Sequence, residues 1–311
     1  MPDRPVIGIT SGDPAGIGPE VIESWLRTGA VPPDRLRLFG PGEWINRVGA
    51  QLGVSGTALG PSDYRARPGR PDRIGAEIAW EALRMAAESC QSGEVDAVVT
   101  APISKAAMAE VGFPHPGHTE FFASAWGDEP VMAFTGGRLR VALVTWHIPL
   151  SAVPVEVTPQ RLERTIRAID WLARAEGIEQ PRIAVCGMNP HAGEGGLLGR
   201  EERDWINPLL QDLAGTGLDL GPSLPADTVF GRMMAGAFDA VVALYHDQGL
   251  APLKTVDFDR SVNVTLGLPH VRTSPDHGTA FELAGKGIAR FESLGNAVQV
   301  ATRLVGYRGL E

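Results

Sequence analysis

The stretch Val6-Ile-Gly-Ile-Thr10-Ser-Gly12-Asp-Pro-Ala-Gly16-Ile-Gly18-Pro-Glu20 decides the fold, because it leads from a short apolar strand through a glycine-rich turn into a helix. Similar apolar runs recur along the chain. Most are nearly uninterrupted, as in strands buried on both faces of a mostly parallel sheet. The predicted strands are residues 6–10, 36–39, 96–100, 131–135, 140–145, 182–187 and 239–245.

Longer helical patterns alternate with these strands. Thr158 supplies a cap immediately before Pro159, which is a strong signal for a helix start. The alternation predicts an α/β protein with three αβα layers. We expect the 311 residues to form one two-lobed unit, with lobe boundaries near residues 150–158 and 222–225, where prolines gather. The predicted helices are residues 19–27, 74–92, 159–175, 200–213 and 289–304.

Composition limits the class of protein. Hydrophobic residues make up 43% and charged residues 21% of the chain, which fits a globular protein. The 28 Lys and Arg against 37 Asp and Glu give a net charge of −9, so we expect no nucleic acid and no membrane among the partners. The chain has two cysteines, and we see no signal peptide and no long apolar span. We therefore expect a cytoplasmic protein.

The glycine-rich turn at residues 12–20 has two interpretations. A dinucleotide-binding fingerprint needs a third glycine, but Pro19, Glu20 and Val21 follow Gly18. It also needs an acidic residue after the next strand, which ends in Phe39-Gly40. We therefore favour a tight strand-to-helix turn. Ligands of layered α/β folds bind outside the carboxyl ends of the strands, so we expect the functional side chains at that edge.

Three of the seven histidines end a predicted strand or lie in the turn after it, namely His147, His191 and His246. On neighbouring parallel strands their imidazoles would converge on one edge of the sheet. Three imidazoles suit Zn²⁺, Co²⁺ or Ni²⁺ and leave positions open for a substrate. Glu194 and Asp247 could orient the rings. The alternative for any single histidine is a hydrogen-bonded structural role, but three analogous positions favour a metal.

Another group of residues suits an anion. Lys254, Asn263 and Arg272 could together bind a phosphate or a carboxylate, unless the two cations simply face solvent. Residues 250–269 around them are apolar and strand-like. His118, with Thr119 beside it, either opens a helix or hydrogen-bonds a substrate carboxylate.

In order along the chain, these motifs resemble the 4-hydroxythreonine-4-phosphate dehydrogenase family of pyridoxal phosphate biosynthesis. The resemblance covers nearly the whole chain and is weakest over residues 41–75. The segments that carry it are Ile9-Thr-Ser-Gly-Asp-Pro-Ala-Gly-Ile-Gly-Pro-Glu20, Thr100-Ala-Pro-Ile-Ser-Lys105, Gly117-His-Thr-Glu-Phe-Phe122, Asn189-Pro-His-Ala-Gly-Glu-Gly-Gly196, Pro225-Ala-Asp-Thr228, Tyr245-His-Asp-Gln-Gly249, Val262-Asn-Val-Thr-Leu-Gly-Leu-Pro269 and Arg272-Thr-Ser-Pro-Asp-His-Gly-Thr-Ala280.

The resemblance implies an NAD-dependent oxidation of the C3 hydroxyl of 4-phosphooxy-L-threonine. Loss of CO₂ from the resulting β-keto acid then gives 3-amino-2-oxopropyl phosphate. It also implies a fold like that of isocitrate and isopropylmalate dehydrogenases, with two lobes around a cleft. The metal ligands it implies are His147, His191 and His246. The substrate-binding residues it implies are His118, Thr119, Lys254, Asn263 and Arg272.

The resemblance extends to cofactors and partners. The segment His277-Gly-Thr-Ala-Phe-Glu-Leu-Ala-Gly-Lys-Gly-Ile-Ala289 resembles the NAD-binding loop of those dehydrogenases. The cofactor-binding residues it implies are His277, Gly278, Thr279 and Ala280, with NAD or NADP as the cofactor. Histidine ligands favour Zn²⁺ or Co²⁺ over Mg²⁺, although the family is credited with all three. Asp227 and Asp247 are the candidates for the base that takes the hydroxyl proton. The resemblance implies a homodimer with a shared active site, in which we expect the partner subunit to supply His246.

Two alternatives stay open. The matched motifs would also serve a relative that oxidises 4-phospho-D-threonate, 4-phospho-D-erythronate or a cyclic dihydrodiol dicarboxylate. The alternative from a different class is a non-catalytic protein that binds a metal or ligand on the same fold. The intact histidine set disfavours it.

Overall fold

The computed structural model describes residues 5–308, which divide between two compact units. Unit 1 takes in Met1–Pro130 and Leu268–Glu311, and unit 2 takes in Val131–Gly267. The expected boundaries near residues 150–158 and 222–225 both lie inside unit 2. The prolines at those places shape the approach to two helices of unit 2 and do not separate lobes.

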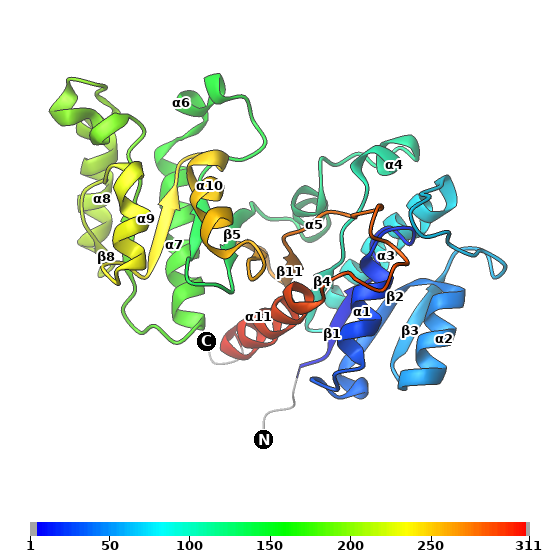
Figure 1. Ribbon diagram of the computed structural model, residues 1–311. Helices are drawn as coiled ribbons and strands as arrows, with labels where there is room; N and C mark the ends of the chain where they lie inside the picture. Colours follow the sequence, from blue (N-terminus) through cyan, green and yellow to red (C-terminus); the bar gives the residue numbers. More distant parts are fainter. Residues whose placement is uncertain (1–4, 309–311) are drawn as a thin grey trace. The chain divides into compact units, whose positions relative to one another are not determined.

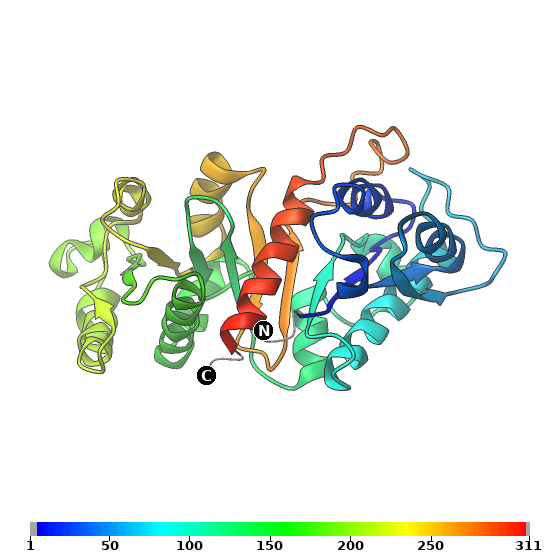
Figure 2. The same ribbon diagram turned by 90° about the horizontal axis from the view of Figure 1, so that it is seen from below.

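Unit 1 is built on a parallel sheet with the strand order β3-β2-β1-β4-β11 (Figure 1). Helices α1, α2 and α11 cover one face, where α1 and α11 lie side by side (Figure 2), and α3 and α5 cover the other. The bounds are β1 (Ile7–Thr10), α1 (Gly18–Leu26), β2 (Leu36–Pro41), α2 (Gly42–Leu52), β3 (Ser55–Leu59), α3 (Arg73–Gln91), β4 (Ala97–Thr100), α4 (Lys105–Glu110), α5 (His118–Trp126), β11 (Val271–Pro275) and α11 (Glu292–Arg308).

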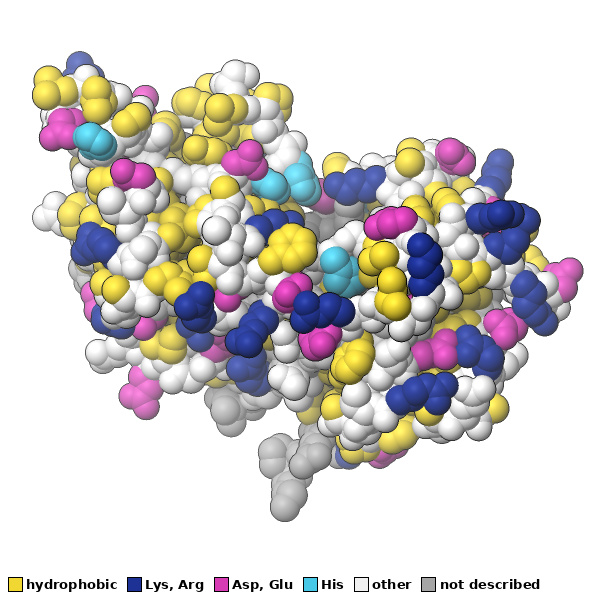
Figure 3. Space-filling view, in the orientation of Figure 1, with side chains coloured by type: hydrophobic (Ala, Val, Ile, Leu, Met, Phe, Trp, Pro, Cys, Tyr) yellow, Lys and Arg dark blue, Asp and Glu magenta, His cyan; other side chains and the backbone are white. Residues whose placement is uncertain are grey.

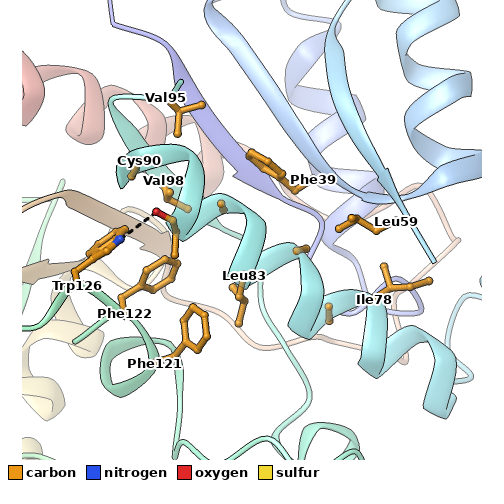
Figure 4. Close-up of a cluster of buried hydrophobic side chains, with 14 of the residues drawn as sticks. Phe39, Leu59, Ile78, Leu83, Cys90, Val95, Val98, Phe121, Phe122 and Trp126 are labelled. Carbon is orange, nitrogen blue, oxygen red and sulfur yellow. Dashed lines mark hydrogen bonds between the residues drawn. The ribbon is translucent and has the colours of Figure 1, made fainter. Parts of the chain in front are cut away.

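The core of unit 1 fixes α5 against the sheet. Phe39 and Val98 reach from the strands toward Leu83 of α3 and Phe122 of α5 (Figure 4). At the far end of α5, the Trp126 Nε1–H donates to the backbone oxygen of Ala87, 3.2 Å away. Because α5 is held along its length, its first residues are held as well, and these carry two of the predicted site residues.

Unit 2 has a mixed sheet with the order β10-β5-β6-β9-β7-β8. Its first three strands pair antiparallel, whereas β6, β9, β7 and β8 pair parallel. Helices α9 and α10 cover one face, and α7 and α8 the other. The bounds are β5 (Val131–Thr135), β6 (Val141–Leu143), α6 (Val153–Glu156), α7 (Pro159–Ala175), β7 (Arg182–Val185), α8 (Asn207–Ala214), β8 (Asp219–Leu220), α9 (Ala226–Met234), β9 (Ala240–Ala243), α10 (His246–Asp257) and β10 (Val262–Leu266).

The three-layer α/β prediction is confirmed, with two corrections. The sheet is less uniformly parallel than the apolar runs indicate, because β10 and β5 form antiparallel pairs. The strand-like interpretation of residues 250–269 is wrong in its first half, where α10 continues to Asp257. Leu250 and Leu253 are three residues apart and both buried, so one helical face satisfies the same apolar pattern.

The surface carries charges of both signs. On the face drawn in Figure 3, basic and acidic side chains are interspersed over the described residues, so that face has no strong field of one sign. Within residues 5–308, none of the helices combines the length and the apolar character that a membrane crossing requires.

Candidate active site

The carboxyl ends of β6 and β9, in unit 2, hold the first group of candidate residues. These strands are parallel neighbours, so the residues that follow them meet at one edge of the sheet. The ring centroids of His147 and His246 are 5.7 Å apart. Both line a cavity of about 270 Å³ together with Trp146, Leu150 and Asp247. The predicted convergence therefore holds for these two histidines.

The carboxylate of Asp247 orients His246. Its Oδ1 lies 2.7 Å from His246 Nδ1, and the Asp247 side chain is 86% exposed. When Nδ1 donates this hydrogen bond, Nε2 keeps its lone pair for a ligand. Gln248 links the turn after β9 to the turn after β7. Its Oε1 accepts the Leu244 N–H at 2.7 Å, and its Nε2 donates to the Gly187 oxygen at 2.8 Å.

His191 lies apart from this pair. It follows β7, which also pairs parallel with β9, but within residues 5–308 no three His, Cys, Asp or Glu side chains gather as a metal site. The His191 side chain is 64% exposed, and its Nδ1 lies 3.0 Å from Glu194 Oε2. One chain thus brings together two of the three predicted metal ligands.

Backbone strain is concentrated in the candidate segments. Five non-glycine residues of the described chain have positive φ, and they are His147, His191, Ala192, Glu194 and Ala280. Their φ values lie between 42° and 53°, in the left-handed region that side chains disfavour. All five belong to, or directly follow, the motifs at strand ends. Such strain persists where the surrounding structure over-determines it, which is common at functional sites.

Unit 1 holds a second group of candidate residues, and these are buried. Arg272 on β11 is 3% exposed, and its Nη2 and Nε donate to Thr100 Oγ1 at 2.7 and 3.2 Å. Burial lowers the pKa of Arg272 to about 9, and the charge of Glu120 acts in the opposite direction. The guanidinium therefore stays charged at neutral pH. A solvent-facing role for this cation is excluded.

His118 opens α5 close enough to Arg272 to feel its charge. Burial, followed by the charges of Arg272 and Lys105, lowers the pKa of His118 well below its usual value. The imidazole is therefore neutral at pH 7, and its buried Nε2 has no hydrogen-bond partner within the described chain. The next residue, Thr119, is 3% exposed. A buried polar atom without a partner is costly, so this place suits a polar ligand.

The predicted cofactor loop packs on the turn after β1. Thr279 accepts the Ile17 N–H through its backbone oxygen at 3.0 Å, and a Cβ on Gly16 would lie 2.9 Å from that oxygen. Gly12 has a φ of 65°, and a Cβ there would lie 2.3 Å from the Pro102 oxygen. Residues 12–20 thus form the expected tight turn. Burial lowers the pKa of His277.

The remaining predicted residues are distributed over unit 2. Lys254 lies on α10, with its Nζ 6.0 Å from the centre of the Phe258 ring, and Asn263 lies on β10 opposite Phe134. Asp227 is exposed in the first turn of α9. Sequence reasoning assigned no role to Thr100 or Gln248. Their places in the motifs were visible, but their bonds depend on tertiary contacts.

A larger cavity lies away from these residues. It measures about 450 Å³ in unit 1 and is lined largely by aliphatic side chains between Ile7 of β1 and Val298 of α11. Ile7 begins its strand, so this cavity is at the amino end of β1. The carboxyl ends, where the polar groups converge, are the better candidate.

The donor set at β6 and β9 fits a divalent cation. Two imidazoles lie side by side, and one has its Nδ1 held by a carboxylate, as ligating histidines commonly do. His191 has the same arrangement with Glu194. Imidazole is a ligand that Zn²⁺ and Co²⁺ accept readily.

Comparisons with known proteins point to one family and cover most or nearly all of the chain. A family model described as "Pyridoxal phosphate biosynthetic protein PdxA" matches residues 46–301. The 4-hydroxythreonine-4-phosphate dehydrogenase of Aromatoleum aromaticum is 46% identical, with 98% of this chain and 98% of that protein covered. The crystal structure of 4-hydroxythreonine-4-phosphate dehydrogenase from Klebsiella pneumoniae is 34% identical, with a TM-score of 0.82 and coverage of 97% of this chain and 99% of that chain.

A more distant structure shares the fold. The terephthalate 1,2-cis-dihydrodiol dehydrogenase from Burkholderia xenovorans is 26% identical, with a TM-score of 0.72 and coverage of 96% of this chain and 98% of that chain. Both units therefore have counterparts in dehydrogenases of this type.

Proposed function

Because the chain belongs to the PdxA family of pyridoxal phosphate biosynthetic proteins, we propose that it oxidises 4-hydroxythreonine 4-phosphate with NAD as the hydride acceptor. Hydride leaves C3 for the nicotinamide, and the hydroxyl proton passes to a base. The β-keto acid then loses its carboxylate as CO₂. The products are 3-amino-2-oxopropyl phosphate, CO₂ and NADH.

One observation carries the proposal for substrate binding. Arg272 is a buried cation at hydrogen-bond distance from Thr100, and the unpartnered Nε2 of His118 lies in the same unit. A charged fork and a neutral imidazole donor suit an anionic group of the substrate. Thr119 adds a hydroxyl beside them. Lys254 and Asn263, which lie in unit 2, are also proposed as substrate-binding residues.

The loop at His277, Gly278, Thr279 and Ala280 is proposed to bind the dinucleotide. Its packing on the turn at Gly16 and Ile17 supports this role, because the loop backbone is held in place before a ligand arrives.

The metal is proposed to bind His147, His191 and His246. A divalent cation held there would supply Lewis acidity to the hydroxyl group being oxidised. The three imidazoles favour Zn²⁺ or Co²⁺ over Mg²⁺. Of the two candidate bases, Asp247 is engaged with His246 and orients it. We therefore retain Asp227 as the candidate for taking the hydroxyl proton.

We infer that a homodimer completes the metal site. His147 and His246 are neighbours in one chain, whereas His191 is not grouped with them. This arrangement favours His191 over His246 as the ligand that crosses between subunits. A two-fold axis would then produce two equal sites. Cytoplasmic location stays a prediction.

The test is NADH formation over a panel of substrates. We expect 4-hydroxythreonine 4-phosphate to be turned over best, and 4-phospho-D-threonate, 4-phospho-D-erythronate and a cyclic dihydrodiol dicarboxylate to be poor substrates. The dihydrodiol relative is 26% identical, against 46% for the 4-hydroxythreonine-4-phosphate dehydrogenase, which supports this order. A higher kcat/KM for any other member would contradict the substrate proposal. No NADH from any member would favour a binding protein.

A further inference from the structure

The segment that carries His191 follows an unusual backbone path. Five successive residues, from His191 to Gly195, have φ between 44° and 81°. Three of them are not glycine, so this path is costly for the isolated chain. Contacts outside the segment must hold it.

Glu202 supplies the contacts at the start of the segment. Its Oε1 accepts the backbone N–H of Asn189 at 2.7 Å, and its Oε2 accepts from Asn189 Nδ2 at 3.0 Å. Both carboxylate oxygens therefore engage one residue, which lies immediately before the segment Pro190–Gly196. Glu201 also accepts from Asn189 Nδ2, at 2.7 Å, but does not contact the backbone N–H.

Glycines allow this close approach. A Cβ on Gly193 would lie 2.7 Å from Glu202 Oε2, and a Cβ on Gly187 would lie 3.2 Å from Glu202 Oε1. Gly199 leaves room for the other partner of the Asn189–Glu202 hydrogen bonds, because a Cβ there would lie 2.2 Å from the Asn189 side chain. The Glu202 carboxylate thus lies against Gly187 and Asn189, which precede the left-handed segment, and against Gly193 within it.

The burial of Glu202 is unusual for its charge. The residue is 2% exposed, and within residues 5–308 no Lys, Arg or His side chain forms an ion pair with it. A buried carboxylate without a cation is costly unless hydrogen bonds replace its hydration. It lies in a short π-helical turn, Glu202–Ile206, a feature often found near functional sites.

We propose that Glu202 is a positioning residue that holds the segment Pro190–Gly196 in its left-handed path and so presents His191 to the metal. The inference rests on the proposed role of His191 as a metal ligand. Groups that support metal ligands from behind typically change metal affinity by about 10- to 100-fold when they are removed.

Glu202→Gln tests the proposal with little change in shape. The amide has a single acceptor oxygen, so one of the two Asn189 donors must face an NH₂ group. Asp204→Asn is the matched control, because it removes the same charge two residues away, where the carboxylate pairs with exposed arginines. Metal affinity is measured by titrating the metal-free protein with Co²⁺ and following its visible absorption. Amide hydrogen exchange of residues 189–196 is measured without metal.

We expect Glu202→Gln to bind Co²⁺ about 10- to 100-fold more weakly and to exchange faster in residues 189–196, with exchange in α7 unchanged. Asp204→Asn should match the wild type in both measurements. Wild-type Co²⁺ affinity in Glu202→Gln would overturn the inference, even if exchange is faster. Should the wild type fail to bind Co²⁺, the metal proposal fails, and the presentation of His191 to the metal fails with it. The exchange data would then report only whether Glu202 holds the segment.

If Glu202→Gln does not fold, Asn189→Ala provides the second variant. It removes the side-chain bonds to Glu201 and Glu202 but keeps the backbone bond of 2.7 Å. We expect a smaller loss of Co²⁺ affinity in the same direction, and an unchanged affinity would overturn the inference.

Discussion

The two units present their functional groups in opposite ways. In unit 1, Arg272 projects from a strand of the all-parallel sheet, is buried, and is already bonded to Thr100 on the neighbouring strand. In unit 2, His147 and His191 lie on loops, at positions with left-handed backbone, and His191 is well exposed. A strand-borne group is rigid before its ligand arrives. A loop-borne group depends on the contacts that support its loop, so the histidines of unit 2 rely more on neighbouring residues than Arg272 does.

The largest expected effect comes from unit 2. Chelation should remove nearly all activity, and Zn²⁺ or Co²⁺ should restore it, because two adjacent imidazoles form the donor set at β6 and β9. His246→Ala should lose Co²⁺ binding and activity while its circular dichroism spectrum stays that of the wild type. Asp128→Asn changes an exposed acidic residue of unit 1 and is the control that preparing a variant does not itself alter metal binding or activity. Full activity in a chelator-treated preparation would show that unit 2 does not act through a metal.

The next effect concerns unit 1. Arg272→Met should lower kcat/KM for 4-hydroxythreonine 4-phosphate roughly 30- to several thousand-fold. This corresponds to a loss of about 2–5 kcal/mol of binding free energy, because the substitution removes a desolvated cation. NAD binding, measured by calorimetry, should change far less. Arg73→Met, on the exposed start of α3, is the matched control. Equal losses in substrate and NAD binding would mean that Arg272 supports the whole unit and does not bind the substrate.

These contrasts also explain what the sequence could predict. The strand β5 and the helix α7 occur at the predicted residues, 131–135 and 159–175, because an uninterrupted apolar run and the Thr158-Pro159 start are local signals. The pairing of His147 with His246 was predictable, since it follows from two parallel strands. The separation of His191 was not, because a run of left-handed residues leaves no periodic pattern in the sequence.

Tertiary contacts account for the other differences. Residues 250–257 contain spaced leucines that suit a strand or a helix, and only their packing on β6 and β9 decides for α10. The importance of Glu202 depends on Asn189, thirteen residues earlier, and on glycines that leave room for the bond. The lobe boundaries at 130/131 and 267/268 coincide with neither proline-rich segment.

A subunit-mixing experiment sharpens the comparison within unit 2. If His147 and His246 come from one subunit and His191 from the other, mixing His147→Ala with His191→Ala should restore about a quarter of wild-type activity after random exchange. Mixing His147→Ala with His246→Ala should restore none, because both lesions affect the same half of each site. The reverse pattern would assign His246 to the partner. Exchange is verified with a tag on one subunit type.

The smallest expected effect is the contribution of the buried His118 to the pH dependence of stability. The pKa of His118 is lowered by burial, by Arg272 and by Lys105, whereas the unfolded chain has an ordinary histidine pKa near 6.5. Below that pH the unfolded state takes up a proton that the folded state resists. The His118 contribution to stability is therefore fully present above pH 6.5 and is lost as the pH falls toward the folded-state pKa.

Urea unfolding at pH 7.5 and pH 5.5 measures this loss. We expect the wild type to lose about 1 kcal/mol more between these two values than His118→Gln does, because each pH unit below 6.5 corresponds to at most about 1.4 kcal/mol for one histidine. His270 and His277, whose pKa values burial also lowers, are present in both proteins and cancel in the difference. The wild type and His118→Gln could instead lose the same free energy of unfolding between the two pH values. His118 would then take up a proton in the folded protein as readily as in the unfolded chain. The contrast between buried groups in unit 1 and exposed groups in unit 2 would not hold for this residue.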